Sequence, residues 1–126
     1  MKILVLQVVS EEIKNYTQYS IPINAKYCIK QGYDFKVVNL EYDENCHYSW
    51  KKLLEVEKEL KKCQYEWIMI VDADAIFNNF DKKLEDIIKE GEKEDDLILV
   101  CDDTPNGGLI NCGVMFFNNL TITEEL

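Results

Sequence analysis

The stretch Trp67-Ile68-Met69-Ile70-Val71-Asp72-Ala73-Asp74 decides the fold of this chain. Its first five residues are apolar, which is typical of a strand buried inside a sheet. In an extended chain, residues i and i+2 point to the same side, so Asp72 and Asp74 can aim at one point while Ala73 faces away. Two carboxylates held that close repel each other, and a hard cation between them removes the repulsion. The pattern therefore predicts a metal site at the end of a buried strand. The simpler alternative is that the two carboxylates cap the turn at Asn78 and Asn79.

Apolar segments before and after this stretch predict strands that alternate with helices. Such alternation indicates an α/β sandwich with a mostly parallel sheet. The carboxyl ends of its strands meet at one edge, where ligands bind, so we expect Asp72 and Asp74 to lie there with residues 7–10 and 102–103. The expected strands are residues 3–9, 34–40, 66–71, 97–101 and 114–117, and the expected helices are residues 20–31, 49–62 and 84–91.

Length and charge limit the function classes. The 126 residues are 47% hydrophobic, enough for one packed domain over residues 1–126. The net charge of −10 argues against a general nucleic-acid or anionic-membrane binder. All basic residues are lysines, so no guanidinium fork is present to hold a phosphate, and an acidic chain would most easily bind a polyanion through a metal.

The distribution of cysteines and apolar runs bears on the compartment. Five cysteines are scattered without a Cys-x-x-Cys pair, which indicates reduced thiols and a cytoplasmic location rather than a disulfide framework. The amino-terminal apolar run is short and meets Glu11-Glu12, so we expect a buried strand there and no signal peptide. No run is long enough to predict a transmembrane segment.

A second polar region follows the strand predicted at residues 97–101. It runs from Asp102-Asp103 through a Gly-rich loop to Asn111-Cys112-Gly113 and then enters the next apolar strand. An ordinary polar loop accounts for this pattern when it is taken alone. The functional interpretation is that the loop lets Asn111 approach a sugar closely, with Gly113 leaving room, because an amide both donates and accepts hydrogen bonds.

The third region is Trp50-Lys51-Lys52, near the start of a predicted helix for which Ser49 is the expected cap. From composition, the simpler interpretation is an amphipathic helix with the aromatic side chain inside and the lysines outside. The functional interpretation is that Lys52 offers a point charge to a phosphate. His47, the single histidine, is expected at the surface.

These regions and two further motifs occur in a particular order along most of the chain. The set comprises Asn24-x-x-Tyr27 with Gly32-Tyr33, then Trp50-x-Lys52-Leu53, the segment at residues 67–79, and finally Asp102, Asn111, Gly113 and Asn119. In this order they resemble the nucleotide-sugar-dependent glycosyltransferases of the galactosyl/mannosyl/xylosyl type, family thirty-four, which have the GT-A fold, a Rossmann-like sandwich.

The resemblance implies a transferase that moves a hexose or pentose from a nucleoside diphosphate sugar, a UDP- or GDP-sugar, with retention of anomeric configuration. It implies Mn²⁺, or Mg²⁺, at Asp74 and Asp72, with Asp72 near the metal or the ribose. Lys52 would lie near the donor phosphates. Asp102, Asn111 and Gly113 would line the sugar pocket. No separate general base is implied, because the leaving diphosphate can take the acceptor proton.

The chain departs from the family pattern in two respects. Asn118-Asn119 stands where the family has Arg-Asn. The family's catalytic domains are also longer, and their downstream part supplies a metal-binding histidine and much of the acceptor pocket. We therefore expect the donor-binding portion of a longer catalytic domain, truncated at its carboxyl end, with the acceptor unidentified.

Two other functions remain open from the residues. The first is a GT-A domain that binds nucleotide and metal without turnover, since the same aspartate pair serves both functions. The second is a phosphatase in which Asp72 attacks phosphorus. Those enzymes usually carry the motif on their first strand, whereas here a β-α-β-α pattern precedes it.

Overall fold

The computed structural model describes residues 1–91, 93, 96–103 and 109–119, with only the backbone at residues 102, 103 and 109. Strands and helices alternate as expected up to residue 91. The elements are β1 (Ile3–Ser10), the short 3-10 helix η1 (Glu11–Ile13), α1 (Lys14–Gln31), β2 (Asp34–Leu40), α2 (Tyr48–Lys61), β3 (Trp67–Val71), α3 (Leu84–Gly91), β4 (Ile98–Asp103) and β5 (Leu109–Asn118).

The strands of the described residues form a five-stranded sheet in the order β2-β1-β3-β5-β4. The β1 strand pairs in parallel with β2 and with β3, whereas β5 is antiparallel to both β3 and β4. Four strands therefore run in one direction, and the prediction of a mostly parallel sheet is confirmed. The expectation that every strand brings its carboxyl end to one edge is wrong for β5, which begins at that edge.

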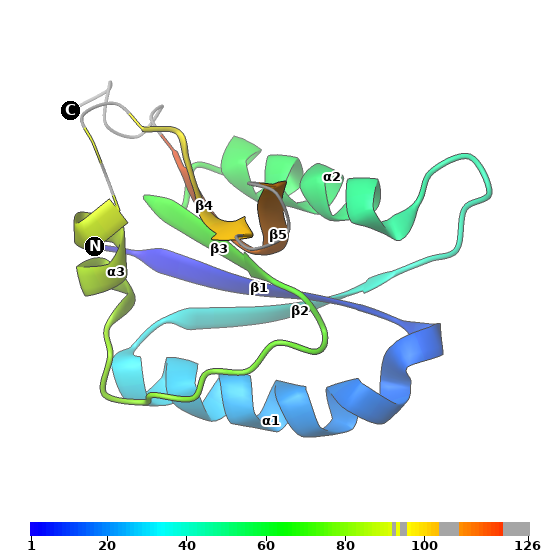
Figure 1. The fold of residues 1–126 in the computed structure, drawn as a ribbon, viewed down its shortest axis with the longest axis horizontal. Coiled ribbons are helices and arrows are strands. Elements are labelled where there is room, and N and C mark those ends of the chain that lie inside the picture. Colours follow the sequence, from blue (N-terminus) through cyan, green and yellow to red (C-terminus); the bar gives the residue numbers. More distant parts are fainter. Residues whose placement is uncertain (92, 94–95, 104–108, 120–126) are drawn as a thin grey trace.

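Helices cover both faces of the sheet, α1 on one side and α2 on the other (Figure 1), and an apolar layer lies between the sheet and each of them. Successive residues of β1 alternate between them: Ile3 and Val5 face the core under α1 and α3, and Leu4 and Leu6 face the core under α2. A strand buried on both faces needs apolar residues at every position. That requirement explains why the runs in β1 and β3 are continuous rather than alternating.

The first long helix begins earlier than its capping signals predict. α1 starts at Lys14, not at Ser20, and Pro22 lies inside it. The helix ends where expected, because Gly32 adopts a left-handed conformation with φ of 80° and its N–H bonds the carbonyl of Cys28. Near the end of the helix Ile29 is exposed, whereas Tyr27 is buried.

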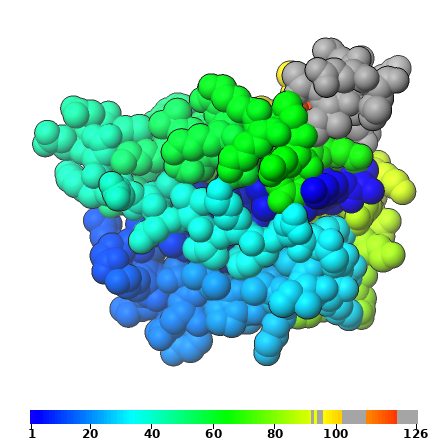
Figure 2. Space-filling view, turned by 180° about the vertical axis from the view of Figure 1, so that it is seen from behind, coloured from blue at the N-terminus to red at the C-terminus, as the bar shows by residue number. Residues whose placement is uncertain are grey.

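The second helix is capped by a different residue from the one expected. His47 is exposed, as predicted, and its Nδ1 accepts the N–H of Ser49 at 3.2 Å, so the histidine and not the serine caps α2. Residues 41–47 form the connection from β2 to α2 and project from one end of the molecule (Figures 1 and 2). No helix in the described part of the chain is both long and apolar enough to span a bilayer.

Candidate functional site

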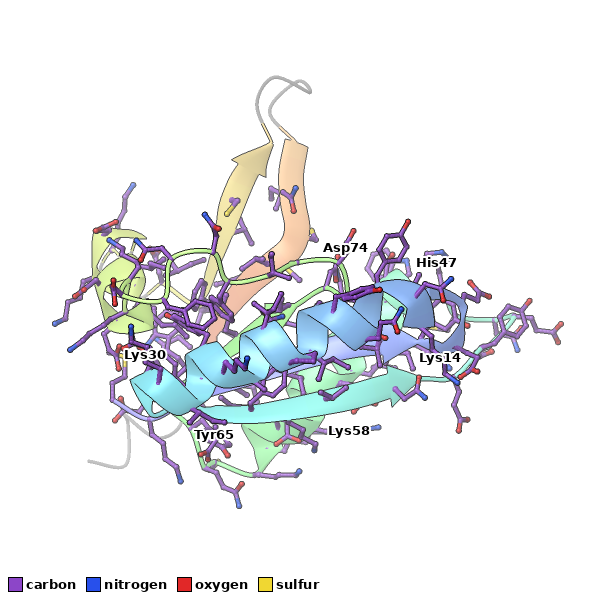
Figure 3. All side chains as sticks on the ribbon, turned by 90° about the horizontal axis from the view of Figure 1, so that it is seen from below. Lys14, Lys30, His47, Lys58, Tyr65 and Asp74 are labelled. Atoms are coloured by element: carbon purple, nitrogen blue, oxygen red, sulfur yellow. The ribbon has the colours of Figure 1, made fainter. Side chains whose placement is uncertain are left out.

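The aspartate pair lies in a turn that begins where β3 ends. Val71 is the last strand residue, and the N–H of Ala75 bonds the carbonyl of Asp72 at 3.1 Å. The strand-like alternation nevertheless continues, because Ala73 is buried while Asp72 is partly exposed and Asp74 exposed. Figure 3 shows Asp74 on the side of the molecule from which the β4–β5 hairpin projects. Asp72 and Asp74 both line one cavity, and a turn rather than an extended strand brings them there. That the two carboxylates converge on one cation stays a prediction.

A buried polar network holds the backbone of this turn. The Gln7 amide donates to Ser20 Oγ at 2.9 Å and to the carbonyl of Ala73 at 3.3 Å, and the Ser20 hydroxyl donates to the same carbonyl at 2.6 Å. Gln7 was expected at the ligand edge, but it is fully buried and faces α1. Hydrogen bonds from Gln7 and Ser20 therefore hold the Ala73 carbonyl on the side of α1. The neighbouring Asp72 and Asp74 line the cavity.

Asn24 continues the network along the segment that follows the turn. Its amide donates to Gln7 Oε1 at 3.0 Å and to the carbonyl of Ala75 at 2.9 Å, and its Oδ1 accepts the N–H of Phe77 at 3.0 Å. Asn24 is 0% exposed. Every polar atom of its amide therefore bonds the strand β1 or the segment at residues 75–77, which makes it the link between α1 and the site.

Tyr27 secures the same segment further along. Its ring stacks on Phe77 with centroids 3.8 Å apart, and its hydroxyl donates to the carbonyl of Lys82 at 2.6 Å. Burial, aided by the nearby Cys28 and Glu85, raises the pKa of Tyr27 to about 12, so the hydroxyl keeps its proton and remains a donor. The Asn24-x-x-Tyr27 motif thus has a structural role: it positions the chain after the aspartates.

Lys52 supplies the positive charge of the site. It is only 7% exposed, whereas Trp50 on the same helix turn is 67% exposed, the reverse of an ordinary amphipathic pattern. The Lys52 ammonium lies 3.1 Å from Asp72 Oδ1 and donates to the carbonyl of Cys112 at 2.7 Å. The simpler interpretation of this helix, with the aromatic inside and the lysines outside, is wrong at these two positions.

The start of β5 reaches the aspartates because its pairing with β4 slips. Val100 is opposite Met115 but Cys101 is opposite Asn111, so residues 112–114 have no partner on β4. This bulge turns the chain toward β3, where the carbonyl of Gly113 accepts the N–H of Asp72 at 2.9 Å. Asn111 Oδ1 accepts the N–H of Gly113 at 2.8 Å.

Gly113 has no side chain, which allows Asn111 and Asp72 to approach its backbone closely. A Cβ at that position would lie 3.1 Å from Asn111 Oδ1 and 3.4 Å from Asp72 Oδ2. The structure thus brings together four of the six predicted site residues, Lys52, Asp72, Asn111 and Gly113, and places Asp74 two residues away on the same turn. For Asp102 the described backbone pairs with Ile110, and the prediction for its side chain lies outside what the structure describes.

Two cavities meet at the Lys52–Asp72 pair. The first, about 410 Å³, is lined by Asp72 and Asp74, by residues 8–10 at the end of β1, and by Tyr16 and Tyr48. The second, about 490 Å³, lies between the first turns of α2 and the start of β5. Ser49, Lys52 and Asp72 line both. The edge therefore offers two adjoining spaces with an ammonium and a carboxylate at their junction.

A larger cavity, about 680 Å³, lies beside β2 and shares no lining residue with the other two. Its buried carboxylate, Glu59, is already paired with Lys36 and with Lys62. Burial would raise the pKa of Glu59, but the two ammonium groups outweigh burial and hold the pKa below its usual range. Charges that satisfy one another leave nothing to bind a ligand, so volume alone does not make this space a site.

The described residues contain no cluster of three or more His, Cys, Asp or Glu side chains that could form a metal cage. Among the same residues, no hydrogen bond or ion pair engages the side chain of Asp74. The carboxylates do not cap the turn at Asn78 and Asn79 either, where Asn79 Oδ1 instead accepts the N–H of Asp81. One partly paired and one open carboxylate thus face a solvent-accessible cavity.

Sequence reasoning missed the roles of Gln7, Ser20 and Asn24, and the two tyrosines of the first cavity. Asn24 was noticed as part of a motif, but two of its three partners are backbone groups more than fifty residues away, which spacing cannot reveal. Tyr16 and Tyr48 lie at the starts of helices that the prediction began too late, at residues 20 and 49. An earlier start for α1 would have placed Tyr16 beside the sheet edge.

Comparisons with known proteins identify a family and similar folds. A model of the galactosyl transferase GMA12/MNN10 family matches residues 2–124. No curated protein matches the sequence. The fold is similar to that of a solved glycosyltransferase involved in the glycosylation of the major capsid of PBCV-1, with a TM-score of 0.76 and 21% identity over 99% of this chain and 63% of that one.

Two further solved structures share the fold at lower similarity. One is A197 from STIV, with a TM-score of 0.57 and 12% identity over 98% of this chain and 68% of that one. The other is the apo-form glycosyltransferase GlyE of Streptococcus pneumoniae TIGR4, with a TM-score of 0.53 and 12% identity over 99% of this chain and 36% of that one. The chain thus spans somewhat under two thirds of the length of the PBCV-1 glycosyltransferase.

Proposed function

Because the chain belongs to the galactosyl transferase GMA12/MNN10 family, we propose that the two joined cavities bind a nucleoside diphosphate sugar for glycosyl transfer. The observation that carries the proposal is the buried Lys52 between them, 3.1 Å from Asp72. A buried ammonium is costly unless it serves a structural or a binding purpose. Here it lies at the point where a ligand spanning both cavities would place its diphosphate.

Lys52 has a donor to spare for such a ligand. An ammonium group carries three N–H donors, and the described contacts with Asp72 and the carbonyl of Cys112 take two of them. The third can point to a phosphate oxygen. In a chain without arginine this lysine supplies the point charge that a diphosphate needs, and Asp72 keeps its second oxygen for another partner.

The donor set fits a divalent cation that arrives with its ligand. Mg²⁺ and similar hard cations use one or two carboxylates together with substrate phosphates and water, rather than a complete protein cage. Asp72 and Asp74 offer two carboxylates to one cavity, which matches this description. We propose that they hold Mn²⁺ or Mg²⁺, which when bound would offset the negative charge that builds on the departing diphosphate.

The remaining residues of the proposed site would bind and orient the donor. The first cavity would take the nucleoside, and the second, which Asn111 and Gly113 line, would take the sugar. With retention of configuration, the bond from the anomeric carbon to the diphosphate breaks, a bond to the acceptor oxygen forms, and the acceptor proton passes to the diphosphate. No residue of this chain is assigned as a general base, and the donor base and the acceptor stay unassigned.

The test is thermal unfolding with UDP or GDP, each with and without Mn²⁺. A ligand at ten times its Kd stabilises by about 1.4 kcal/mol, which raises the Tm of a chain of this size by about 5 °C. We expect such a shift for one nucleotide, dependent on Mn²⁺ and lost in Asp74→Asn. Asp86→Asn, an exposed aspartate on α3 that lines neither cavity, is the control and should behave as wild type.

Two outcomes would contradict the proposal: no shift with either nucleotide in a folded protein, or an Asp74→Asn variant that responds as wild type does. Turnover is a separate measurement. Mn²⁺-dependent release of UDP or GDP from the matching nucleotide sugar would indicate transfer or hydrolysis. Binding without release would favour a domain that holds nucleotide and metal without catalysis.

A further inference from the structure

The exposed Trp50 is not used by the proposed diphosphate site. It lies on the first turn of α2, shares one helix face with Ser49 and Leu53, and lines the second cavity with them. The start of β5 contributes Ile110 and Asn111 to the same lining. The cavity therefore offers apolar side chains, among them an exposed indole ring, together with a polar amide.

This combination suits a sugar ring. A pyranose has a face of C–H groups and a rim of hydroxyls. The C–H face packs on an aromatic ring, while the hydroxyls need groups that both donate and accept hydrogen bonds, as the Asn111 amide does. Trp50 also loses little conformational freedom on binding, because its side chain has only two rotatable bonds.

The junction of the two cavities indicates whether this sugar belongs to the donor or to a separate saccharide. A nucleoside diphosphate sugar has its three parts in linear order, and the Lys52–Asp72 pair lies where both cavities meet. A donor with its diphosphate at that pair and its nucleoside in the first cavity extends its sugar into the second. The donor sugar, rather than a separate saccharide, is thus the ligand that reaches Trp50.

We infer that Trp50 is a binding residue for the sugar of the donor, packing against its C–H face and setting affinity for the nucleotide sugar over the free nucleotide. The inference rests on the proposed function, because it assumes that a diphosphate binds at Lys52. It adds a residue and a selectivity that the diphosphate site alone does not require.

Tryptophan fluorescence can test this without any catalytic assay. The chain has two tryptophans, and Trp67 is only 3% exposed, so quenching by acrylamide reports almost entirely on Trp50. The probes, all with Mn²⁺, are UDP against UDP-galactose and GDP against GDP-mannose. We expect the nucleotide sugar to lower the quenching constant at least about twofold, while the matching nucleotide alone changes it little.

Variants add an affinity measurement by titration calorimetry. Trp50→Ala should weaken binding of the nucleotide sugar by about fivefold to tenfold, the usual range for one aromatic contact, and leave binding of the nucleotide unchanged. Leu54→Ala is the matched control, because Leu54 is exposed on the same helix but does not line the second cavity. It should bind both ligands as wild type does.

The outcomes separate the two proposals. If a nucleotide binds with Mn²⁺ but Trp50→Ala binds the nucleotide sugar as tightly as wild type, the role of Trp50 is refuted and the diphosphate site stands. Protection of Trp50 by methyl galactoside or methyl mannoside, but not by a nucleotide sugar, would make the ligand an acceptor sugar and overturn the assignment. If no nucleotide binds, both proposals fail.

Discussion

The backbone and the side chains of the turn at residues 72–74 differ in how their polar groups are satisfied. On the backbone side, the Ala73 carbonyl accepts hydrogen bonds from Gln7 and Ser20, both buried. On the side-chain side, Asp72 has one partly exposed ion pair and Asp74 has none among the described residues. Hydrogen bonds from β1 and α1 thus hold the backbone of the turn, while two incompletely paired carboxylates line the cavities.

In this fold, the polar groups that stabilise the structure are therefore separate from those that are available to bind a ligand. Within the described part of the chain, no buried side-chain nitrogen or oxygen lacks a hydrogen bond, so the α1 side has nothing left to offer a ligand. At the site edge, by comparison, the carboxylates are incompletely paired. Substitutions under α1 should therefore lower stability, whereas substitutions at the site edge should lower ligand affinity.

The largest effect on stability is expected at Asn24. Replacing it by alanine removes three buried hydrogen bonds and leaves the carbonyl of Ala75 and the N–H of Phe77 without partners. We expect Asn24→Ala to lower the free energy of unfolding by about 3 kcal/mol, measured by urea denaturation. Asn78→Ala, exposed in the same segment, should change it by less than about 0.5 kcal/mol. A similar small change for both would mean that the network does not hold the turn.

Glu59 on α2 is a buried carboxylate paired with two lysines, in contrast to the incompletely paired Asp72 and Asp74. Glu59→Gln should cost about 1–2 kcal/mol at pH 7, a discounted value because Lys36 and Lys62 are each nearly half exposed. The folded-state pKa of Glu59 is lowered, so this stabilisation is fully present above the ordinary carboxyl pKa and is lost as the pH falls through the lowered pKa. Unfolding curves of the two proteins should converge in acid, and a constant difference at all pH values would contradict the ion-pair explanation.

Lys52 should affect both stability and affinity, because it is buried and also belongs to the proposed site. Lys52→Met keeps the aliphatic stem and removes the ammonium from Asp72 and from the carbonyl of Cys112. We expect the free energy of unfolding to fall by only about 1 kcal/mol, because Asp72 is partly exposed to water. The affinity for nucleotide should fall at least about tenfold. Lys51→Met, whose ammonium bonds the carbonyl of Glu41 instead, is the control. Equal losses of affinity in both variants would point to a general charge effect.

The smallest effect on stability is expected at Asp74. Its side chain is exposed and has no described partner, so Asp74→Asn should leave the Tm within about 2 °C of wild type in the absence of ligand. The same variant should lose the Mn²⁺-dependent response to nucleotide. A marked drop in Tm without ligand would show that Asp74 is structural and would remove the contrast between the two sides.

Much of the fold follows from the sequence, because buried strands and helix periods are local signals. The continuous apolar runs of β1 and β3 predict their burial on both faces, and Gly32 predicts the end of α1. The start of α1 does not follow, because the helix continues through Pro22 and its first turns are supported by tertiary contacts. The direction of β5 depends on its long-range pairing with β3, which no local pattern encodes.

The site was predictable to the extent that it lies on strand ends. Asp72, Asp74, Asn111 and Gly113 follow or precede apolar runs, and the sheet brings them to one edge. The exposure of Trp50 and the burial of Lys52 could not be derived from periodicity, because the helix turns its lysine inward to meet Asp72. The partners of Asn24 are likewise set by the packing of α1 against a distant segment.

The most direct test of the central claim, that Asp72 and Asp74 hold a metal with a nucleotide, is paramagnetic broadening by Mn²⁺ in amide NMR spectra. With the stabilising nucleotide present, we predict that substoichiometric Mn²⁺ broadens the amide signals of Asp72, Asp74 and Gly113 first, and that Asp74→Asn abolishes the selective effect. Broadening centred on the acidic run at residues 90–96, or unchanged in Asp74→Asn, would contradict it.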